Sequence, residues 1–241
     1  MSDYIINPLY GKRAVFDGDS ICQAGTASGG WPARIGCTNA MEWYNYGIGG
    51  GTVTAEVYQG EGDGKKPRHW ISRSIDEIHE KHPELDYLIL EGGTNDADNL
   101  GMSSPRFGRI DLSDYSGNFD DTTFTGALET LFYKAIHYYP KAKIGFIIAQ
   151  KMGVRPIGFG ADNKRRWYFL RAIEVCKKWG VPYIDLWESS PLNPTLKCYF
   201  DPDLSAEDNL AAGKAYEDGQ HLNDIGFDII SPAIEAWMMS L

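Results

Sequence analysis

The sequence predicts a three-layer α/β/α sandwich built on a five-stranded parallel sheet. Three observations support this prediction. Five short apolar runs alternate with longer helical patterns, most of these runs are continuously apolar, and no Pro- or Ser-rich linker interrupts them. A parallel strand that helices cover on both faces has such a continuous apolar pattern. We therefore expect one domain that spans residues 1–241.

The candidate strands are five to eight residues long and are followed by polar or glycine-containing segments. They cover residues 13–17, 42–46, 85–91, 143–150 and 182–187. The longest strongly apolar stretch, residues 144–149, is far too short to span a bilayer.

Helical periodicity marks four segments between and after these strands. They cover residues 70–82, 125–139, 163–179 and the chain from about residue 223 to its end. In the first, Ile71, Ile75 and Ile78 share one stripe, and Pro83 follows the end of the pattern. Gly180 stands where a helix C-cap is expected. Pro232 should kink or split the last helix.

Two connections are unusually long for a compact α/β domain. Residues 97–123 are rich in Asp, Gly, Ser and Asn, and residues 153–162 are also irregular. Long loops of this kind are more often functional than idle, so we expect both to border a substrate site.

Composition excludes several classes of partner. The chain carries 33 acidic and 23 basic residues, a net charge of −10, which disfavours binding to nucleic acid or insertion into an anionic membrane. Four cysteines without a Cys-x-x-Cys pair support neither a disulfide framework nor a zinc or redox motif. The first ten residues do not resemble a signal peptide. We expect a cytoplasmic protein, or a secreted one if the natural chain carries a leader; the sequence does not predict its oligomeric state.

Glycine-containing corners follow the first three predicted strands. They are residues 17–20, 45–52 and 92–96, and a further polar turn, residues 218–221, precedes the last helix. In an open parallel sheet, ligands bind beyond the carboxyl ends of the strands, where the strand order reverses. If the first strand lies between the second and the third, these corners become neighbours there.

The polar residues at these corners suit acyl transfer. Ser20 becomes a nucleophile when a base such as His221 takes its proton, and Asp218 can hold the other ring nitrogen. The backbone N–H groups of Ser20 and Gly50 and the side-chain amide of Asn95 could form an oxyanion hole. The remaining histidines lie on helical patterns, where a solvated or packing role is expected: His69, His79, His82 and His137.

Together these corners resemble the four sequence blocks of the SGNH (GDSL-type) hydrolase superfamily. The matching blocks are Gly18-Asp19-Ser20, Asn45-x-Gly47-x-x-Gly50, Gly93-Thr94-Asn95-Asp96 and Asp218-x-x-His221. The resemblance extends from about residue 13 to about residue 230 and implies a flavodoxin-like fold, with ester hydrolysis that needs no metal or other cofactor. Many members carry Leu, Asp and Pro where this chain has Ile21, Gly51 and Leu222, which leaves the subfamily open.

Some residues near these blocks allow an alternative functional interpretation. Cys22 is a rival nucleophile, but no cysteine-hydrolase signature surrounds it. The glycine run 47–51 could suggest a dinucleotide loop, yet it follows the second strand rather than the first. Asp224 is the nearest rival to Asp218, although it lies at the start of the presumed last helix, where a negative charge is favourable.

We therefore predict a serine esterase that works through an acyl-enzyme. The loop 97–123 is polar with scattered aromatic residues rather than broadly apolar. This composition favours a short acyl group such as acetyl on a polar or carbohydrate-like alcohol. The alternatives within the same class are a GDSL-type lipase, a lysophospholipase and a thioesterase. Those of another class are a non-catalytic carbohydrate-binding module and a flavodoxin-like nucleotide binder.

Overall fold

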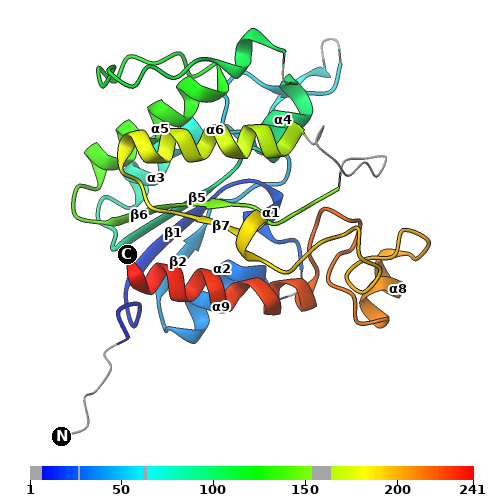
Figure 1. Ribbon diagram of the computed structural model, residues 1–241. Helices are drawn as coiled ribbons and strands as arrows, with labels where there is room; N and C mark the ends of the chain where they lie inside the picture. The colour runs from blue at the N-terminus through cyan, green and yellow to red at the C-terminus, as the bar shows by residue number, and fades with distance from the viewer. Residues whose placement is uncertain (1–6, 27, 62–63, 102, 154–163) are drawn as a thin grey trace, which may run out of the picture.

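Five strands form one parallel sheet, as predicted, in a computed structural model that describes residues 7–26, 28–61, 64–101, 103–153 and 164–241. The strand order is β2 (Glu42–Asn45), β1 (Arg13–Asp17), β5 (Tyr87–Glu91), β6 (Lys143–Ile148) and β7 (Tyr183–Asp185). The first strand therefore does lie between the second and third predicted strands. Figure 1 shows the sheet between two helical layers.

The helices that cover the two faces come from different parts of the chain. One face carries α3 (Ile71–Lys81), α5 (Phe124–Tyr138) and α6 (Lys164–Trp179), and α5 contacts both of the others. The opposite face carries α2 (Gly30–Thr38) and α9 (Asp224–Ser240), which pack together. This arrangement confirms the predicted α/β/α sandwich.

Alternate residues of the central strands β1 and β5 enter two separate hydrophobic cores. Val15 and Leu88 belong to the cluster beneath α3, α5 and α6, whereas Phe16 and Ile89 belong to the cluster beneath α2 and α9. Successive side chains of a strand point to opposite faces of the sheet. Because both faces are covered, every position of β5 is buried, which explains the continuous apolar runs.

Helix α2 was not predicted from the sequence, and neither were the short elements that complete the chain. They are α1 (Ser20–Gln23), the hairpin β3 (Tyr58–Gln59) and β4 (Lys66–Pro67), α4 (Thr94–Leu100), the 3-10 turn Pro105–Phe107, α7 (Leu186–Ser189) and α8 (Ala206–Ala211). Most of them are too short to show a hydrophobic period, and α4 consists mainly of polar residues.

Several predicted boundaries need correction. The strand expected over 182–187 ends at Asp185, because its carboxylate accepts hydrogen bonds from the backbone N–H groups of Trp187 and Glu188 and so starts α7. Helix α9 runs through Pro232 without splitting. Of the irregular segment 153–162, only Gly153 falls within the described residues.

The long connection 97–123 does not border the site along its length. Its first residues belong to α4, and its middle packs on the end of α6: the Tyr115 hydroxyl donates to the Lys178 carbonyl at 3.3 Å, and Phe119 packs edge-on against Trp179. These contacts keep the middle of the loop on the outer helical layer. None of the described residues that line the cavity beside Ser20 comes from 97–123, so the expectation that this loop forms the substrate rim is not supported.

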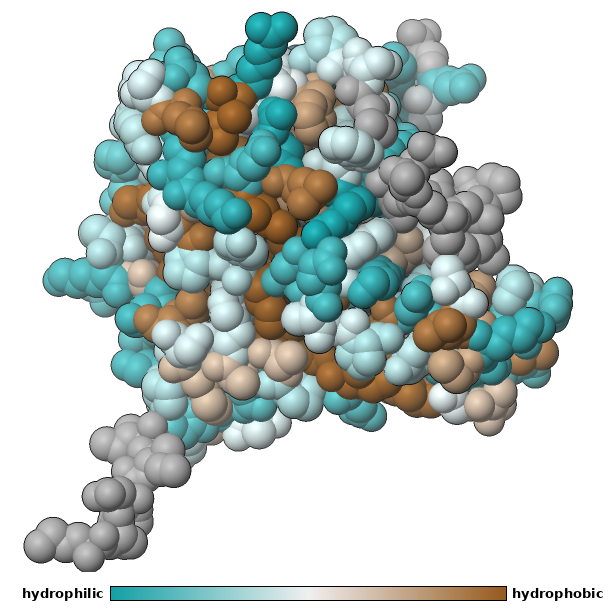
Figure 2. Space-filling model, in the orientation of Figure 1, coloured by the Kyte–Doolittle hydropathy of each residue, from teal (hydrophilic) through white to brown (hydrophobic). Residues whose placement is uncertain are grey.

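Exposed apolar side chains are spread over the surface. On the face drawn in Figure 2, brown residues are interleaved with teal and white ones. None of the helices in the described ranges is both long enough and apolar enough to cross a membrane.

Candidate active site

Ser20 lies at the turn where β1 gives way to α1. The preceding residue, Asp19, caps this helix, since its carboxylate accepts the Ile21 N–H at 2.9 Å. A Cβ on Gly18 would stand 2.8 Å from both the Cys22 Cβ and a Glu91 carboxylate oxygen. The close approach of these chains therefore requires glycine here, and it leaves Ser20 partly exposed at the carboxyl edge of the sheet.

The structure brings Ser20, His221 and Asp218 into one chain of hydrogen bonds. Ser20 Oγ lies 2.9 Å from His221 Nε2, and His221 Nδ1 lies 2.9 Å from Asp218 Oδ2. The other carboxylate oxygen of Asp218 accepts the backbone N–H groups of Gln220 at 2.9 Å and His221 at 2.8 Å. The turn thus fixes the carboxylate, which places the imidazole proton on Nδ1 and leaves Nε2 to accept the serine proton.

Neither rival residue occupies such a position. Asp224 accepts hydrogen bonds from Ser28 and Arg34 at the first turn of α9. Cys22 is fully buried, and burial together with the charge of Glu91 raises the pKa of its thiol well above the usual range. A buried thiol that resists ionisation is a poor nucleophile.

The glycine loop after β2 lies beside Ser20. Asn45 Oδ1 accepts the Gly47 N–H at 2.9 Å, and Gln23 Oε1 accepts the Gly49 N–H at 2.8 Å, so side chains on both sides hold the loop. Gly50 has a φ of +77°, a left-handed conformation that favours glycine. A Cβ on Gly49 would lie 4.0 Å from the Ser20 Cβ, which shows how closely the loop approaches the serine.

Asn95, on the first turn of α4, bridges the serine corner and the glycine loop. Its Nδ2 donates to the Gly51 carbonyl at 2.9 Å and to Asp19 Oδ2 at 3.2 Å. Both amide hydrogens are therefore engaged with the protein, and the bond to Asp19 is the longer one. These two bonds hold the amide in place, and an oxyanion would share one of the hydrogens with its present acceptor.

A second buried carboxyl, Glu91, lies beneath Asp19. The Asp19 backbone N–H donates to Glu91 Oε2 at 3.1 Å, while Glu91 Oε1 has no hydrogen-bond partner. Burial, with the adjacent charge of Asp19, raises the pKa of Glu91 well above its usual range, and burial also raises the pKa of Asp19. A retained proton on Glu91 relieves the repulsion between two carboxyl groups in this desolvated site.

Asp96 has a supporting role next to Asn95. It is buried and accepts the backbone N–H groups of Val53 at 3.0 Å and Thr54 at 2.9 Å, which ties α4 to the segment after the glycine loop. Burial raises the pKa of Asp96 to about 6.

Other charged residues near the site were not identified from the sequence. Arg68 Nη1 donates to the Gly50 carbonyl at 2.8 Å. His69 precedes α3 rather than lying on it, and its Nε2 is 2.9 Å from the fully buried Asp17 carboxylate, which corrects the expectation of a helical histidine. Arg165 is buried between α4 and the turn that carries His221. These contacts join residues far apart in the chain, so no local sequence motif could predict them.

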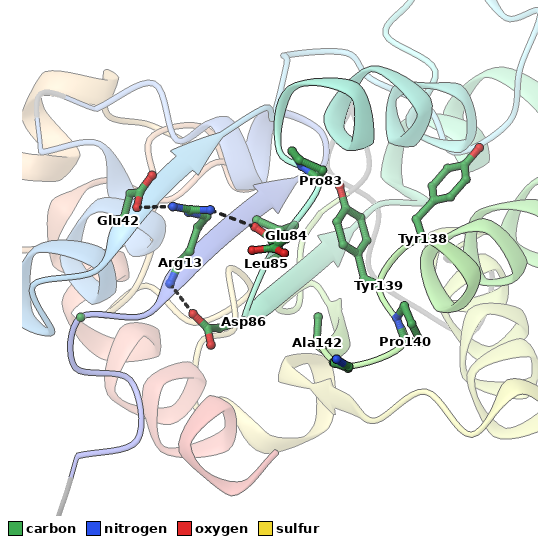
Figure 3. A pocket seen from close by; sticks show the side chains of 12 residues that line it. Arg13, Glu42, Pro83, Glu84, Leu85, Asp86, Tyr138, Tyr139, Pro140 and Ala142 are labelled. Atoms are coloured by element: carbon green, nitrogen blue, oxygen red, sulfur yellow. Dashed lines mark hydrogen bonds and ion pairs between the residues drawn. The ribbon is translucent and has the colours of Figure 1, made fainter.

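A small cavity opens beside Ser20 and His221. Its volume is about 220 Å³, and polar Gln23, Thr26 and Glu217 line it together with the apolar ring of Phe227. A larger cavity, about 560 Å³, lies at the opposite edge of the sheet, where the strands begin. Figure 3 shows Arg13 in that cavity, bound to Glu42 and to the Glu84 carbonyl. The groups suited to acyl transfer lie only at the smaller of these two cavities.

No group of three or more His, Cys, Asp or Glu side chains in the described ranges is arranged to hold a metal ion.

Comparison with solved structures agrees with the fold described above. A protein from Lactobacillus plantarum has a similar structure, with a TM-score of 0.70, 21% identity and coverage of 96% of this chain and 98% of its own. The acetyl xylan esterase AlAXEase has a TM-score of 0.56 and 18% identity, with coverage of 95% of this chain and 100% of its own. The lipase/acylhydrolase from Enterococcus faecalis has a TM-score of 0.57 and 18% identity, with coverage of 95% of this chain and 96% of its own. No curated protein matches the sequence.

The sequence itself identifies the family. Residues 16–229 match the GDSL-like lipase/acylhydrolase family, a range that contains all four of the glycine-, serine-, asparagine- and histidine-bearing corners described above. The chain belongs to the GDSL-like lipase/acylhydrolase family and is a hydrolase of ester bonds.

Proposed function

We propose that this protein is a serine esterase that forms an acyl-enzyme on Ser20 and removes short acyl groups, acetyl foremost, from a polar or carbohydrate-like alcohol. The observation that carries the proposal is the chain of 2.9 Å contacts from Ser20 Oγ through His221 to Asp218. A non-catalytic carbohydrate-binding module would have no use for an imidazole held between a hydroxyl and a carboxylate.

The reaction follows from this arrangement. Ser20 Oγ attacks the ester carbonyl as its proton passes to His221 Nε2, and the resulting imidazolium is stabilised by Asp218. Donors at Ser20 N, Gly50 N and Asn95 Nδ2 stabilise the oxyanion. His221 then protonates the leaving alcohol, and a water that gives its proton to the same nitrogen releases the acid.

The small cavity supports the choice of alcohol. Because His221 must protonate the leaving oxygen, the alcohol lies on the His221 side of the serine, and this is the side on which the 220 Å³ cavity opens. Gln23, Thr26 and Glu217 offer hydrogen-bonding groups there for a hydroxylated alcohol. The printed name of one structural neighbour, an acetyl xylan esterase, agrees with an acetyl ester of a carbohydrate.

A chain-length series tests the proposal. The wild type, Ser20→Ala and a control, Ser113→Ala in an exposed turn, are assayed on p-nitrophenyl acetate, butyrate, octanoate and palmitate. We expect acetate to be the best substrate and Ser20→Ala to lose ~10³-fold or more in kcat, with Ser113→Ala unchanged. A maximum at octanoate or palmitate would favour the lipase alternative, for which the Enterococcus faecalis neighbour is a precedent.

A further inference from the structure

Gln220 is a buried amide inside the turn that carries the histidine and the aspartate. Its side chain is 8% exposed, its backbone N–H donates to Asp218 Oδ1, and its carbonyl accepts a hydrogen bond from Gln150 Nε2 at 3.2 Å. These backbone contacts fix where its side chain starts. The four sequence blocks of the family resemblance assign it no part.

The direction of the Gln220 amide is set by Arg165. The guanidinium is 2% exposed, pairs with Asp98 at 2.6 Å, and donates from Nη2 to Gln220 Oε1 at 2.9 Å. Because a guanidinium has only donors, the oxygen of the amide must face it and the nitrogen must face the other way. The nitrogen then points toward His221, with Gln220 Nε2 and His221 Nε2 3.5 Å apart.

That separation leaves the amide hydrogens available. A distance of 3.5 Å is too long for a strong hydrogen bond, and His221 Nε2 already faces Ser20 Oγ at 2.9 Å. The hydrogens of Gln220 therefore face the place where the serine hydroxyl and the imidazole meet. In ester cleavage, the oxygen that receives the histidine proton must occupy this place.

We propose that Gln220 is a further catalytic residue, which donates a hydrogen bond to the leaving oxygen of the ester; this inference rests on the proposed esterase function. In acylation, the bond between Ser20 Oγ and the acyl carbon forms while the serine proton goes to His221 Nε2. The bond from that carbon to the alcohol oxygen then breaks, and the oxygen leaves with the proton from Nε2. Gln220 stabilises the negative charge that this oxygen carries as the bond breaks.

Deacylation uses the same position in reverse. A water replaces the alcohol, accepts a hydrogen bond from Gln220, gives its proton to His221 Nε2 and bonds to the acyl carbon. The bond to Ser20 Oγ breaks, and the serine oxygen takes the proton back. The chain Asp98, Arg165, Gln220 thus orients a donor toward the side of the reacting centre opposite Asp218.

A leaving-group comparison distinguishes this role from a structural one. The leaving oxygen of ethyl acetate is far more basic than that of p-nitrophenyl acetate, whose charge spreads into the aromatic ring. Loss of the donor must therefore slow ethyl acetate more than p-nitrophenyl acetate. A general distortion of the triad would slow both esters alike. The parameter to compare is kcat/KM, because it reports acylation for both esters.

The experiment measures kcat/KM on both esters, by pH-stat and by absorbance, for the wild type, Gln220→Met, Gln220→Glu and Ser20→Ala. Gln220→Glu keeps the shape and the contact with Arg165 but replaces the donor with an acceptor, so it tests the proposal even if Gln220→Met fails to fold. Gln59→Met, in the exposed hairpin strand β3, is the matched control.

We expect both Gln220 variants to lose ~10- to 100-fold on ethyl acetate and several-fold less on p-nitrophenyl acetate, with Gln59→Met unchanged. Equal losses on the two esters, or no loss, would overturn the role of Gln220 while leaving the esterase intact. A wild type that hydrolyses neither ester, or a Ser20→Ala variant as active as the wild type, would instead overturn the proposed function.

Discussion

Asn95 Nδ2 donates to Asp19 Oδ2 at 3.2 Å, so the residue before the serine holds the amide that we assign to the oxyanion hole. The other Asn95 hydrogen binds the Gly51 carbonyl at 2.9 Å. The two bonds link the corners after β1, β2 and β5. The position of the amide is therefore set by the same strand order that brings the corners together.

Removal of the Asp19 carboxylate should impair catalysis more than binding. In Asp19→Ala, the Asn95 amide loses a bond that orients it, and we expect kcat to fall ~10-fold with little change in KM. The lost helix cap should also cost about 1 kcal/mol of stability. Steady-state kinetics on p-nitrophenyl acetate and urea unfolding measure the two effects. Asp111→Ala, which removes a similar turn-capping carboxylate from an exposed loop, is the control. A change in KM alone would contradict this view of Asp19.

Glu91→Gln should alter how stability depends on pH. The folded-state pKa of Glu91 is raised, so its contribution is fully present below about pH 4, the unfolded value, and is lost as pH rises through the folded value. A glutamine does not ionise, so the variant should gain stability relative to the wild type between pH 5 and pH 8. Urea unfolding across this range measures the difference. A wild type-to-variant difference that stays constant with pH would show that Glu91 is ionised in the folded state and that its pKa is not raised.

Gly50→Ala should separate backbone strain from catalysis. The left-handed φ of +77° makes a Cβ cost about 1–2 kcal/mol, and that Cβ would stand 2.6 Å from Arg68 Nη1. Gly213→Ala is the matched control, since its φ is +73° and nothing lies within 4 Å of the added Cβ. Both variants should lose similar stability in urea, but only Gly50→Ala should lose kcat. Full activity of Gly50→Ala would contradict the expectation that the added Cβ, crowded by Arg68, moves the backbone N–H of residue 50 out of place.

Asp218→Asn should leave the fold intact and nearly abolish turnover. An amide nitrogen in place of Oδ2 cannot accept the His221 Nδ1 proton, so the imidazole loses its required tautomer and the stabilisation of its charged form. We expect kcat to fall ~10³- to 10⁴-fold. Asp224→Asn, which changes the rival carboxylate, should keep its activity. The reverse pattern of kcat values would assign the role to Asp224.

Much of the fold could be predicted because its signals are local. The continuous apolar pattern of Tyr87–Glu91 follows from burial on both faces, and the offset from Asp218 to His221 is set by one turn. The helix Thr94–Leu100 could not be predicted, because its polar sequence has no apolar period.

The contacts that support the site could not be predicted from sequence patterns. Arg165 and Gln220 are 55 positions apart, and His69 and Asp17 are 52 apart, so only the packed tertiary structure brings each pair together. The position of the loop 97–123 could not be predicted for a related reason. Its composition indicates a loop, but it does not indicate that Tyr115 and Phe119 pack on the end of helix α6.

Covalent labelling tests most directly whether Ser20 is the nucleophile. The wild type and Ser20→Ala are treated with a serine-directed fluorophosphonate, and intact-mass and peptide mass spectrometry locate the adduct. The proposed function predicts one adduct on the wild type, at Ser20, and none on the variant. A wild type that hydrolyses p-nitrophenyl acetate yet carries the adduct at another residue, or a Ser20→Ala variant labelled to the same extent, would contradict it.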